Sequence, residues 1–503
     1  MPIFKKNLHL APRIGLITIA GLTSAYFLTA QSQSNTATTP NTANIHPVAL
    51  SADPLYAQGA GQRPTLTLAL SVEFPTVGAQ YRDDYSSSKK YLGYFDASSC
   101  YEYTNDTSED NRWFTRTGNA SSNYSCGGTG FSGNFMNWAT SSSIDLLRYG
   151  LTGGDRIQDT STLTVLQRAV LQNDFWNSGS YFPKKSISGT LAAGAVPNSL
   201  RGDHSGTIYI SNCSNRVFFS NDSSTGSCSA PTFSNSLGAK APTASGNTAA
   251  SNSTALSTGM FFTRVKVCES SGDRLQDPRS TLCQKYPNGN FKPVGNMQKY
   301  SDRIRLAAFG YLMESGTNRY GGVLRAPMTY VGPRAYDNSG NALTGNNPVQ
   351  EWNSDTGVFL PNPRGDTNFN RSGVINYLNT FGRMPDYEGI YKTNDPVGEL
   401  YYESLRYLQG LQPTPQAVSD FDNAKRAGFP AYSTWTDPFE GSSSTQNYSC
   451  LRNSILLIGD VNTHADKSLP GNDRTGNNDF SRTNDVNISA NIPDFKELSL
   501  IHI

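Results

Sequence analysis

Two short apolar runs, far apart in the chain, constrain the fold more than any other feature of the sequence. Residues 65–72 read TLTLALSV, and residues 454–460 read SILLIGD. Each run is continuous and apolar and then gives way to a polar or acidic residue, as buried strands of parallel sheets do. We therefore expect both segments to lie side by side in one helix-covered sheet, with their polar ends at a shared edge.

Segments between the two runs alternate between strand-like and helix-like patterns. Residues 302–313 and 322–332 are predicted strands, whereas residues 373–384 and 394–410 have helical spacing. The last helix is expected to bury one apolar stripe, which consists of Val397, Leu400, Tyr401, Leu405 and Leu408. This alternation predicts an α/β fold with crossover connections.

Two further helices are predicted earlier in the chain. Residues 134–154 carry apolar side chains at helical spacing and end in two glycines, which form a stop signal. Residues 164–176 repeat the helical pattern. In contrast, residues 230–259 are rich in Ser, Thr and Ala, and we expect them to form a surface insertion without a core of its own.

The N-terminus has the pattern of an export signal. Lys5, Lys6 and Arg13 precede an apolar stretch over residues 14–30, after which the chain becomes polar. This predicts a secretory signal peptide over residues 1–32, used by the Sec route, with an uncleaved membrane anchor as the alternative. Residues 33–62 are then a flexible linker, and no stable membrane span remains after cleavage. The formal net charge of +1 provides no basic surface for nucleic acid.

The chain contains seven cysteines, which in an exported protein indicate disulfide bonds. The simplest scheme joins neighbours along the chain, while other pairings stay open. Its three pairs are Cys100 with Cys126, Cys213 with Cys228, and Cys268 with Cys283, and Cys450 is left over.

Four blocks of sequence, in this order, resemble a known family. They read SGNFMNWAT…SSIDLLRYGLTGG, TVLQRAVL, DPVGELYYESLRYL and ILLIGDVNTHADKSLPG. Together they resemble the N-terminal half of the PilC/PilY family of type IV pilus tip-associated proteins, from about residue 64 to residue 472. The resemblance implies a domain similar to a von Willebrand factor A domain, followed by a calcium-dependent β-propeller. It also implies work at the pilus tip in assembly, retraction control, adhesion and surface sensing.

The resemblance implies the following domain organisation. A von Willebrand factor A-like (Rossmann-type) domain spans residues 63–480 and carries large, β-rich and irregular disulfide-bearing insertions at about 82–133 and 176–300. Residues 481–503 are then the truncated start of the following region, because the family would continue into its propeller where this chain ends. A frameshift or a fragment is the leading explanation, and a natural short form is the alternative.

The resemblance also points to a metal site. An A-type domain builds an octahedral Mg²⁺ site from Asp-x-Ser-x-Ser after the first strand, a Thr from a second loop and an Asp from a third. Here Ser71, Glu73 and Pro75 occupy the first motif, Asp395 replaces the Thr, and Asp460 fits the third position. The implied site is therefore degenerate, with Mg²⁺ or Ca²⁺ as its possible cofactor and Pro75 contributing no ligand.

Two alternatives to a metal site remain open. The carboxylates of Glu73, Asp395 and Asp460 would repel one another unless a cation or a proton intervened, so the site could also be empty. Asp395 directly before Pro396 is a good helix N-cap with proline at the first helical position, which would explain the acid without a metal. Asp460 could simply cap the next loop.

Other candidate features are weaker. The tripeptide Arg201, Gly202 and Asp203 could serve as an adhesion motif, although three residues also arise by chance. The loop over residues 460–473 is rich in oxygen ligands but lacks the spacing of an EF-hand. Tyrosines crowd residues 81–103, where they could form an adhesive surface or pack in strands.

We predict an exported, non-enzymatic type IV pilus tip adhesin or biogenesis factor, located in the periplasm or outer membrane, at the pilus tip and on the cell surface. Its expected partners are pilin subunits or minor pilins and a host-cell or abiotic surface. The alternatives are an exported metal-dependent hydrolase acting through Glu73 and Asp460, and a nonfunctional truncated fragment. Catalysis has little support, because the sequence shows no nucleophile-elbow or phosphate-binding motif.

Overall fold

The computed structural model describes the chain in twelve segments. They are residues 64–71, 74–172, 176–177, 179–201, 205–220, 259–269, 282–313, 321–337, 340–419, 421–439, 452–459 and 469. The chain divides into two units, Met1–Ala52 and Asp53–Ile503, and every described residue belongs to the second. The predicted signal peptide and linker therefore lie outside the described residues.

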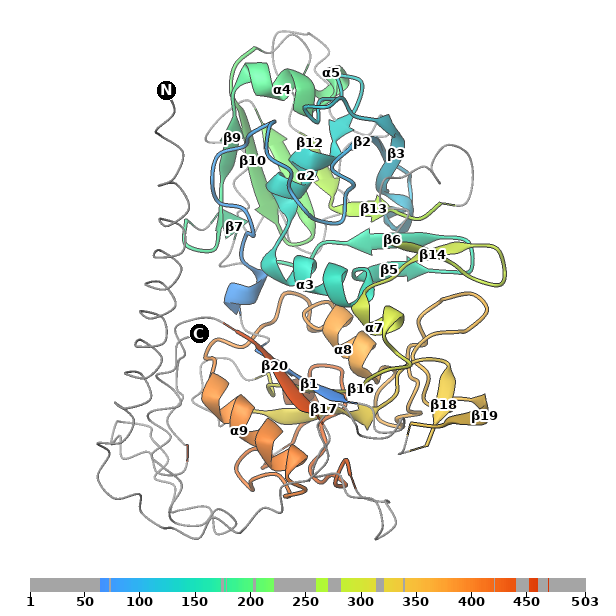
Figure 1. Ribbon diagram of the computed structural model, residues 1–503. Helices are drawn as coiled ribbons and strands as arrows, with labels where there is room; N and C mark the ends of the chain where they lie inside the picture. Colours follow the sequence, from blue (N-terminus) through green and yellow to red (C-terminus); the bar gives the residue numbers. More distant parts are fainter. Residues whose placement is uncertain are drawn as a thin grey trace, which may run out of the picture. The chain divides into compact units, whose positions relative to one another are not determined.

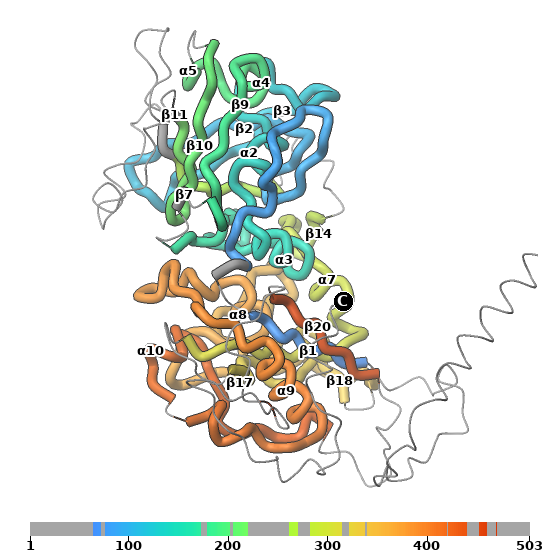
Figure 2. The backbone as a smooth tube through the Cα atoms, turned by 90° about the vertical axis from the view of Figure 1, so that its left-hand side faces the viewer, coloured from blue at the N-terminus to red at the C-terminus, as the bar shows by residue number. Residues whose placement is uncertain are grey.

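A four-stranded mixed sheet brings the two apolar runs of the sequence together. Its strand order is β17-β16-β1-β20, with β1 (Thr65–Leu70) parallel to both β16 (Arg305–Gly310) and β20 (Asn453–Ile458). The fourth strand, β17 (Val323–Thr329), is antiparallel to β16. Figures 1 and 2 both show β1, in blue, beside β20, in red. The expectation that the first and last apolar runs pair in one sheet is confirmed, as are both strands predicted between them.

Helices cover both faces of this sheet. The ring of Phe309, in β16, lies 5.6 Å from the ring of Tyr407 in α9 (Val397–Leu408). At the next residue, Gly310, an added Cβ would meet Tyr377 of α8 (Val374–Thr380). Because consecutive strand residues point to opposite faces, α8 and α9 lie on opposite sides. Both helices were predicted, and the two central strands, β1 and β16, are buried in the sheet that they cover.

The buried face of α9 differs from the predicted stripe. Leu400 is fully buried, but Tyr401 is exposed and Tyr402 and Tyr407 are buried instead. The helix also buries the carboxylate of Glu403, which accepts a hydrogen bond of 2.6 Å from the Thr414 hydroxyl. The prediction was wrong at Tyr401 because α9 is enclosed on more than one side, so a single apolar stripe does not describe it.

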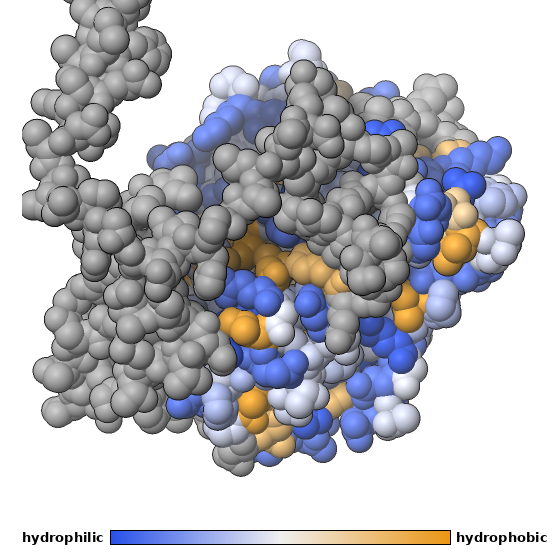
Figure 3. All heavy atoms as spheres, turned by 60° about the horizontal axis from the view of Figure 1, so that its bottom comes forward, coloured by the Kyte–Doolittle hydropathy of each residue, from blue (hydrophilic) through white to orange (hydrophobic). Residues whose placement is uncertain are grey.

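Exposure is uneven across the sheet. β1 is buried along nearly its whole length, whereas β20 is exposed, with Leu456 36% and Leu457 38% accessible. On the face drawn in Figure 3, apolar residues form small patches between hydrophilic ones. The large exposed apolar side chains of the described residues are Leu92, Tyr300, Leu343, Ile390, Tyr401, Leu456 and Leu457. β20 is therefore the terminal strand of the described sheet, and it is apolar.

A second region, which we call the aromatic region, is built from two further sheets. The six-stranded sheet has the order β4-β2-β3-β13-β6-β5, and the four-stranded sheet has the order β12-β11-β10-β9. The strands are β2 (Ser99–Thr104), β3 (Trp113–Asn119), β4 (Phe131–Ser132), β5 (Arg156–Asp159), β6 (Thr164–Gln167), β9 (Lys185–Ile187), β10 (Ile208–Cys213), β11 (Arg216–Ser220), β12 (Gly259–Phe262) and β13 (Arg264–Lys266). We call the four-stranded sheet with α8 and α9 the sheet region.

Rings fill the core of the aromatic region. Phe114 is fully buried, and its ring centroid lies 4.9 Å from Tyr103, 5.2 Å from Phe131 and 5.4 Å from Phe95. Most of the tyrosines between residues 81 and 103 are also buried or half-buried. The adhesive-surface interpretation of these tyrosines is therefore wrong, because they supply the apolar volume between the strands.

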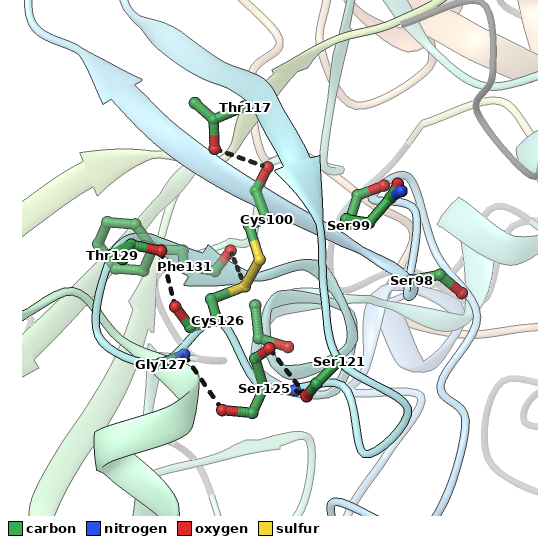
Figure 4. Close-up of a disulfide and its surroundings, with 12 residues drawn as sticks. Ser98, Ser99, Cys100, Thr117, Ser121, Ser125, Cys126, Gly127, Thr129 and Phe131 are labelled. Carbon is green, nitrogen blue, oxygen red and sulfur yellow. Dashed lines mark hydrogen bonds between the residues drawn. A yellow bond between two sulfur atoms is a disulfide. The ribbon is translucent and has the colours of Figure 1, made fainter. Parts of the chain in front are cut away.

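Disulfides join the loops of the aromatic region to its strands. Cys100, in β2, is bonded to Cys126 across 26 residues, with the Cα atoms 5.7 Å apart (Figure 4). The hydroxyls of Thr117 and Thr129 donate to the carbonyls of Cys100 and Cys126, at 3.2 and 2.7 Å. A second bond joins Cys268 and Cys283. Both pairs match the predicted scheme.

The remaining cysteines are only partly described. Cys213 is disulfide-bonded, while its predicted partner, Cys228, lies outside the described residues, as does Cys450.

The predicted helix over residues 134–154 is in fact two helices. α2 (Gly133–Thr140) has Ser141 as its C-cap, and α3 (Ser143–Thr152) begins after its N-cap, Ser142. The Ser142 backbone N–H and hydroxyl both donate to Asp145, at 3.0 and 2.7 Å, so the serines start a new helix rather than continue the old one. The predicted stop is confirmed, since Gly153 caps α3 in the left-handed region at φ 85°.

The predicted helix over residues 164–176 is wrong. Residues 164–167 form β6, which pairs antiparallel with β5 and with β13. All four residues of β6 are buried. A strand buried on both faces has no alternating pattern, so its sequence can be mistaken for part of a buried helix.

A buried ion pair connects the two regions. The Arg383 guanidinium, just after α8, donates two hydrogen bonds to the Asp155 carboxylate, at 2.6 and 2.5 Å. Arg148 of α3 donates to the carbonyls of Leu378 and Phe381, at 2.8 and 2.9 Å. These contacts tie the end of α3 to the end of α8 and make the two regions parts of one unit.

Shorter elements complete the described structure. They are η2 (Phe74–Val77), η3 (Glu109–Asn111), β7 (Trp176–Asn177), β8 (Phe182–Pro183), α4 (Gly189–Ala195), α5 (Asn198–Arg201), β14 (Cys283–Lys285), β15 (Phe291–Pro293), α7 (Asn296–Lys299), β18 (Arg334–Tyr336), β19 (Ala342–Asn346) and α10 (Asn423–Arg426). Within the described segments, no helix combines the length and apolarity that crossing a membrane would require. The architecture is mixed α/β with several sheets, and the more specific von Willebrand factor A fold and the predicted domain boundaries stay predictions.

Candidate functional site

The candidate site lies where β1 and β20 end. Leu70 is paired with Ile458, and the backbone N–H of Ser71 donates to the carbonyl of Ile458 at 2.8 Å. A Cβ added to Gly459 would lie 3.1 Å from the Cβ of Ser71. The two strands therefore end together at one edge of the sheet, which is where ligands bind in open α/β sheets.

The start of α9 reaches the same place. A Cβ at Gly459 would also lie 3.2 Å from Cγ2 of Val397, the first residue of the helix. Asp395, two residues earlier, is 1% exposed. Of the four predicted metal ligands, Ser71 and Asp395 are therefore in segments that meet at the strand ends. Glu73 and Asp460 lie outside the described residues, so only the residues that precede them can be placed.

The structure places Pro396 and not Asp395 at the N-cap position of α9. The N-cap position of α9 is Pro396, with no side-chain bond to the helix, and the first helical residue is Val397. The carbonyl of Asp395, rather than its carboxylate, accepts the Val397 N–H at 2.7 Å. The helix therefore begins one residue later than the N-cap interpretation predicts.

Two residues that the sequence analysis missed complete the site. The Ser71 hydroxyl donates to the Tyr311 hydroxyl at 3.2 Å, and both side chains are buried. The Nζ atom of Lys392 lies 5.6 Å from the centre of the Tyr311 ring, and Lys392 is 1% exposed. We call Ser71, Tyr311, Lys392, Asp395 and Gly459 the strand-tip site.

The composition of the strand-tip site can be compared with what a divalent cation needs. Mg²⁺ requires nearly octahedral oxygen ligands and usually keeps several waters. Among the described residues, no group of three or more His, Cys, Asp or Glu side chains could hold a metal ion. The described part of the site instead holds one carboxylate, a serine already bonded to a phenol, and a lysine.

The packing around Tyr311 is tight. A Cβ at Gly321 would come within 2.9 Å of the Tyr311 ring, and it would also overlap Pro396. The Gly321 N–H donates to the buried carboxylate of Glu399 at 2.9 Å. The strand-tip site is therefore enclosed by the loop before β17 and by the start of α9, rather than open to solvent on that side.

The remaining predicted site residues are only partly described. Arg201 ends α5, and its guanidinium donates to the side chain of Asn198 at 2.9 Å. Gly202 and Asp203 lie outside the described residues, as does most of the polar loop over residues 460–473. The adhesion motif and that loop stay predictions.

Comparisons with known proteins point to one family. The family profile described as "PilY1 homolog, small alpha/beta domain" matches residues 82–233, and the profile described as "PilY1 homolog, second domain" matches residues 309–499. No solved structure matches the chain.

Two curated proteins of Xylella fastidiosa (strain Temecula1 / ATCC 700964) are similar to the chain, and each is named "Type IV pilus biogenesis factor PilY1 homolog". One is 34% identical over 452 residues, which cover 85% of this chain and 34% of the relative. The other is 25% identical over 444 residues, which cover 80% and 28%. The chain thus spans about a third of the length of the curated relatives it matches.

Proposed function

We propose a function from one premise, that the chain belongs to the PilY1 family. The names of its relatives suggest a type IV pilus biogenesis factor located in the cell envelope or on the pilus. On this basis we infer that the chain is exported by the Sec route, reaches the pilus tip and cell surface, and acts there by binding rather than by catalysis.

The observation that carries the proposal is the extent of the similarity. A relative named as a pilus biogenesis factor matches 85% of this chain. That match is too long to fall within either region alone, so it includes the sheet region and the aromatic region together. The disulfides support export, because such bonds form and persist mainly in oxidising compartments.

Binding is the role that the aromatic region favours. Its ring-filled core and its disulfides hold loops such as residues 105–112, between β2 and β3, on a rigid base. Several side chains of this loop are exposed and polar. Loops positioned by a rigid scaffold commonly carry recognition. Pilin subunits or minor pilins are the proposed partners on the pilus, with a host-cell or abiotic surface as the target of adhesion.

Deletion and complementation in the source bacterium test the proposal. We expect deletion to reduce surface piliation, and the chain of residues 1–503 to restore it and to appear in sheared pilus fractions. A chain with Leu343→Ser, a change at an exposed position of β19, serves as the matched control and should restore piliation equally. Unchanged piliation after deletion, together with absence of the chain from pilus fractions, would contradict the proposal.

Adhesion requires a separate measurement. Cells complemented with Asp203→Glu should bind a host-cell surface less than cells with the unaltered chain if the tripeptide Arg201–Asp203 contributes. Equal binding would remove this motif from the proposed function and leave the role in pilus biogenesis intact.

A further inference from the structure

Three buried arginines gather around one carboxylate in the aromatic region. Arg216 is the first residue of β11, Arg264 is the first residue of β13, and Arg112 lies between η3 and β3. All three contact Glu109, the first residue of η3. Arg112 and Arg216 lie within ion-pair distance of its carboxylate, and the Arg264 side chain donates to its backbone carbonyl at 2.7 Å. We call these four residues the arginine site.

The single carboxylate of the arginine site does not satisfy the guanidinium groups. Its oxygens lie 4.0 Å from Arg112 and 3.7 Å from Arg216, which is too far for hydrogen bonds. The Arg216 side chain is 2% exposed, and its Nε and Nη1 atoms have no hydrogen-bond partner among the described residues, nor has Nη1 of Arg112. Leaving a buried charged donor without a partner is costly, so these groups need an explanation. An acceptor bound at this place would supply the missing hydrogen bonds.

Contacts with Phe262 hold two of the arginines in position. The guanidinium carbons of Arg216 and Arg264 lie 3.9 and 4.3 Å from the centre of this ring. Arg264 also donates to the side chain of Gln167 at 2.8 Å. Burial lowers the pKa of Arg216 to about 10, while Glu109 opposes this shift and Arg264 adds to it. The guanidinium groups are therefore fixed in place, charged at neutral pH and short of negative charge.

The Glu109 side chain is placed so that it can turn away from the arginines. It is 41% exposed, and it belongs to the loop over residues 105–112, whose residues other than Arg112 are exposed or half-buried. Turning into water would cost this carboxylate only its two loose ion pairs, because water would solvate it. The arginines are buried and cannot follow it. Such a movement would leave a place of carboxylate size beside fixed guanidinium groups.

Two other acids of the same loop lie near the arginine site without occupying it. Asp110 is exposed, and Asp106 accepts the backbone N–H of Ser108 at 2.8 Å. Within the described segments, neither acid forms an ion pair with the three arginines, although Asp106 interacts with Arg112, and Asp110 with Arg264, at longer range. Salt screens such exposed charges. Glu109 is thus the acid whose carboxylate occupies the site.

We propose that the arginine site binds a carboxylate of an acidic peptide, which takes the place of the Glu109 side chain. Planar guanidinium groups can donate two parallel hydrogen bonds to a carboxylate, and Glu109 shows that a carboxylate is accommodated here. The inference rests on the proposed function, because it names the chemistry of a protein partner that the loop over residues 105–112 recognises. It is tested on the purified chain with defined peptides, so its failure is distinguishable from unchanged piliation after deletion.

Fluorescence anisotropy of labelled peptides tests the proposal on the purified chain of residues 1–503. A tetraglutamate peptide should bind more tightly than a tetraglutamine peptide. Glu109→Gln removes the internal competitor, so it should tighten the binding of tetraglutamate by about ten-fold. Asp110→Asn is the matched control, because it removes the same charge from the same loop without vacating the site. This control should change the affinity much less.

A double variant locates the bound peptide. Adding Arg216→Gln to Glu109→Gln should abolish the gain in affinity, because it removes the guanidinium with the most unpaired donors. Circular dichroism shows whether the double variant folds. If it does not fold, Arg112→Gln replaces Arg216→Gln, since the Arg112 side chain is less deeply buried.

Any one of four results overturns the proposal. The first is equal binding of tetraglutamate and tetraglutamine to the Glu109→Gln chain. The second is a gain in affinity for Glu109→Gln that is no larger than the gain for Asp110→Asn, which would mean that only net charge matters. The third is a gain that survives in the folded double variant, which would place the peptide elsewhere on the chain. The fourth is displacement of the labelled peptide by inorganic phosphate at a lower concentration than by unlabelled tetraglutamate, which would assign the site to phosphate.

Discussion

The sheet region and the aromatic region are stabilised in different ways. In the sheet region, strands from opposite ends of the sequence pair side by side, and helices cover both faces. In the aromatic region, segments closer together in sequence are held by ring contacts and by disulfides. The first arrangement gathers strand ends into one site, and the second holds loops on a rigid base. Because the two regions are stabilised differently, substitutions at the candidate site and at the candidate binding surface should each act on their own region. This holds as long as the junction between the regions stays intact.

The largest expected effect is at that junction. Arg383→Ala leaves the fully buried Asp155 carboxylate without its partner, which should lower the free energy of unfolding by about 3–5 kcal/mol. Denaturant unfolding followed by tryptophan fluorescence measures the loss and shows whether one transition becomes two. The control is Lys89→Ala, because the pair of Lys89 and Asp83 is exposed and should contribute less than about 1 kcal/mol. Equal effects of the two changes would show that the buried pair does not couple the regions.

The second expected effect is a loss of stability in the aromatic region that leaves the sheet region unchanged. Replacing both Cys100 and Cys126 by serine opens a loop of 26 residues and should cost roughly 3.5 kcal/mol in the chain-entropy model. Hydrogen exchange should become faster in β2 and β4, which lie beside this bond, than in β1 and β16. Faster exchange in the sheet region to the same extent would show that the disulfide stabilises the whole unit and not the aromatic region alone.

The third expected effect is a change of stability with pH, and its direction is opposite in the two regions. Glu351 accepts the N–H groups of Val374 and Ile375 at the start of α8, at 2.8 and 2.7 Å, and Gly373 at φ 94° lets the carboxylate approach this closely. Burial raises the pKa of Glu351 from 4.5 to about 7, while these hydrogen bonds oppose the shift. The folded chain thus holds the proton more tightly than the unfolded chain, so stability falls as pH rises from 4.5 to about 7.

The variant Glu351→Gln isolates this contribution. Between those two pH values, the free energy of unfolding of the unaltered chain should fall by at most roughly 3 kcal/mol more than that of the variant.

In the aromatic region, burial and the nearby Arg168 lower the pKa of Lys185 from 10.5 to about 7. Stability should therefore rise from about pH 7 to pH 10.5, and Lys185→Met should flatten that rise. Denaturant midpoints across the pH range measure both, and identical pH profiles for each variant and the unaltered chain would contradict the assignments.

Sequence patterns predicted the sheet region better than the aromatic region. The apolar run that forms β1 could be recognised because a strand buried on both faces needs continuous apolar residues, and α8 and α9 have clear helical spacing. The run that forms β20 was also recognised as a strand, but it is exposed and not buried as the pattern predicted. The same rule failed at β6. Its four buried residues fit a helical pattern as well as a strand, and only the pairing with β13 shows that they form a strand. The break between α2 and α3 had a local signal that was overlooked, since Ser142 and Asp145 have the spacing of a capping box.

The strand-tip site was predicted in part. The positions of Ser71 and Asp395 follow from strand ends and family motifs. Tyr311 directly follows β16, but the predicted strand extended to residue 313, so reasoning from strand ends did not single it out. Lys392 had no signal in the sequence, since it lies in an irregular loop and reaches the Tyr311 ring only through the tertiary fold.

The smallest expected effect compares neighbouring strands within the sheet region. Leu457 of β20 lies opposite Ala69 of β1 in the parallel register, and Leu457 is 38% exposed whereas Ala69 is fully buried. Leu457→Thr should change the free energy of unfolding by no more than about 0.5 kcal/mol, because it removes apolar surface that is already partly in water and introduces a β-branched residue, which suits a strand. The same change should reduce self-association at high concentration, since an exposed apolar edge strand can pair with another chain. Sedimentation velocity measures the association, and denaturant unfolding measures the stability. A loss above about 2 kcal/mol would show that this side chain is as buried as a core leucine, and β20 would then not be an exposed edge.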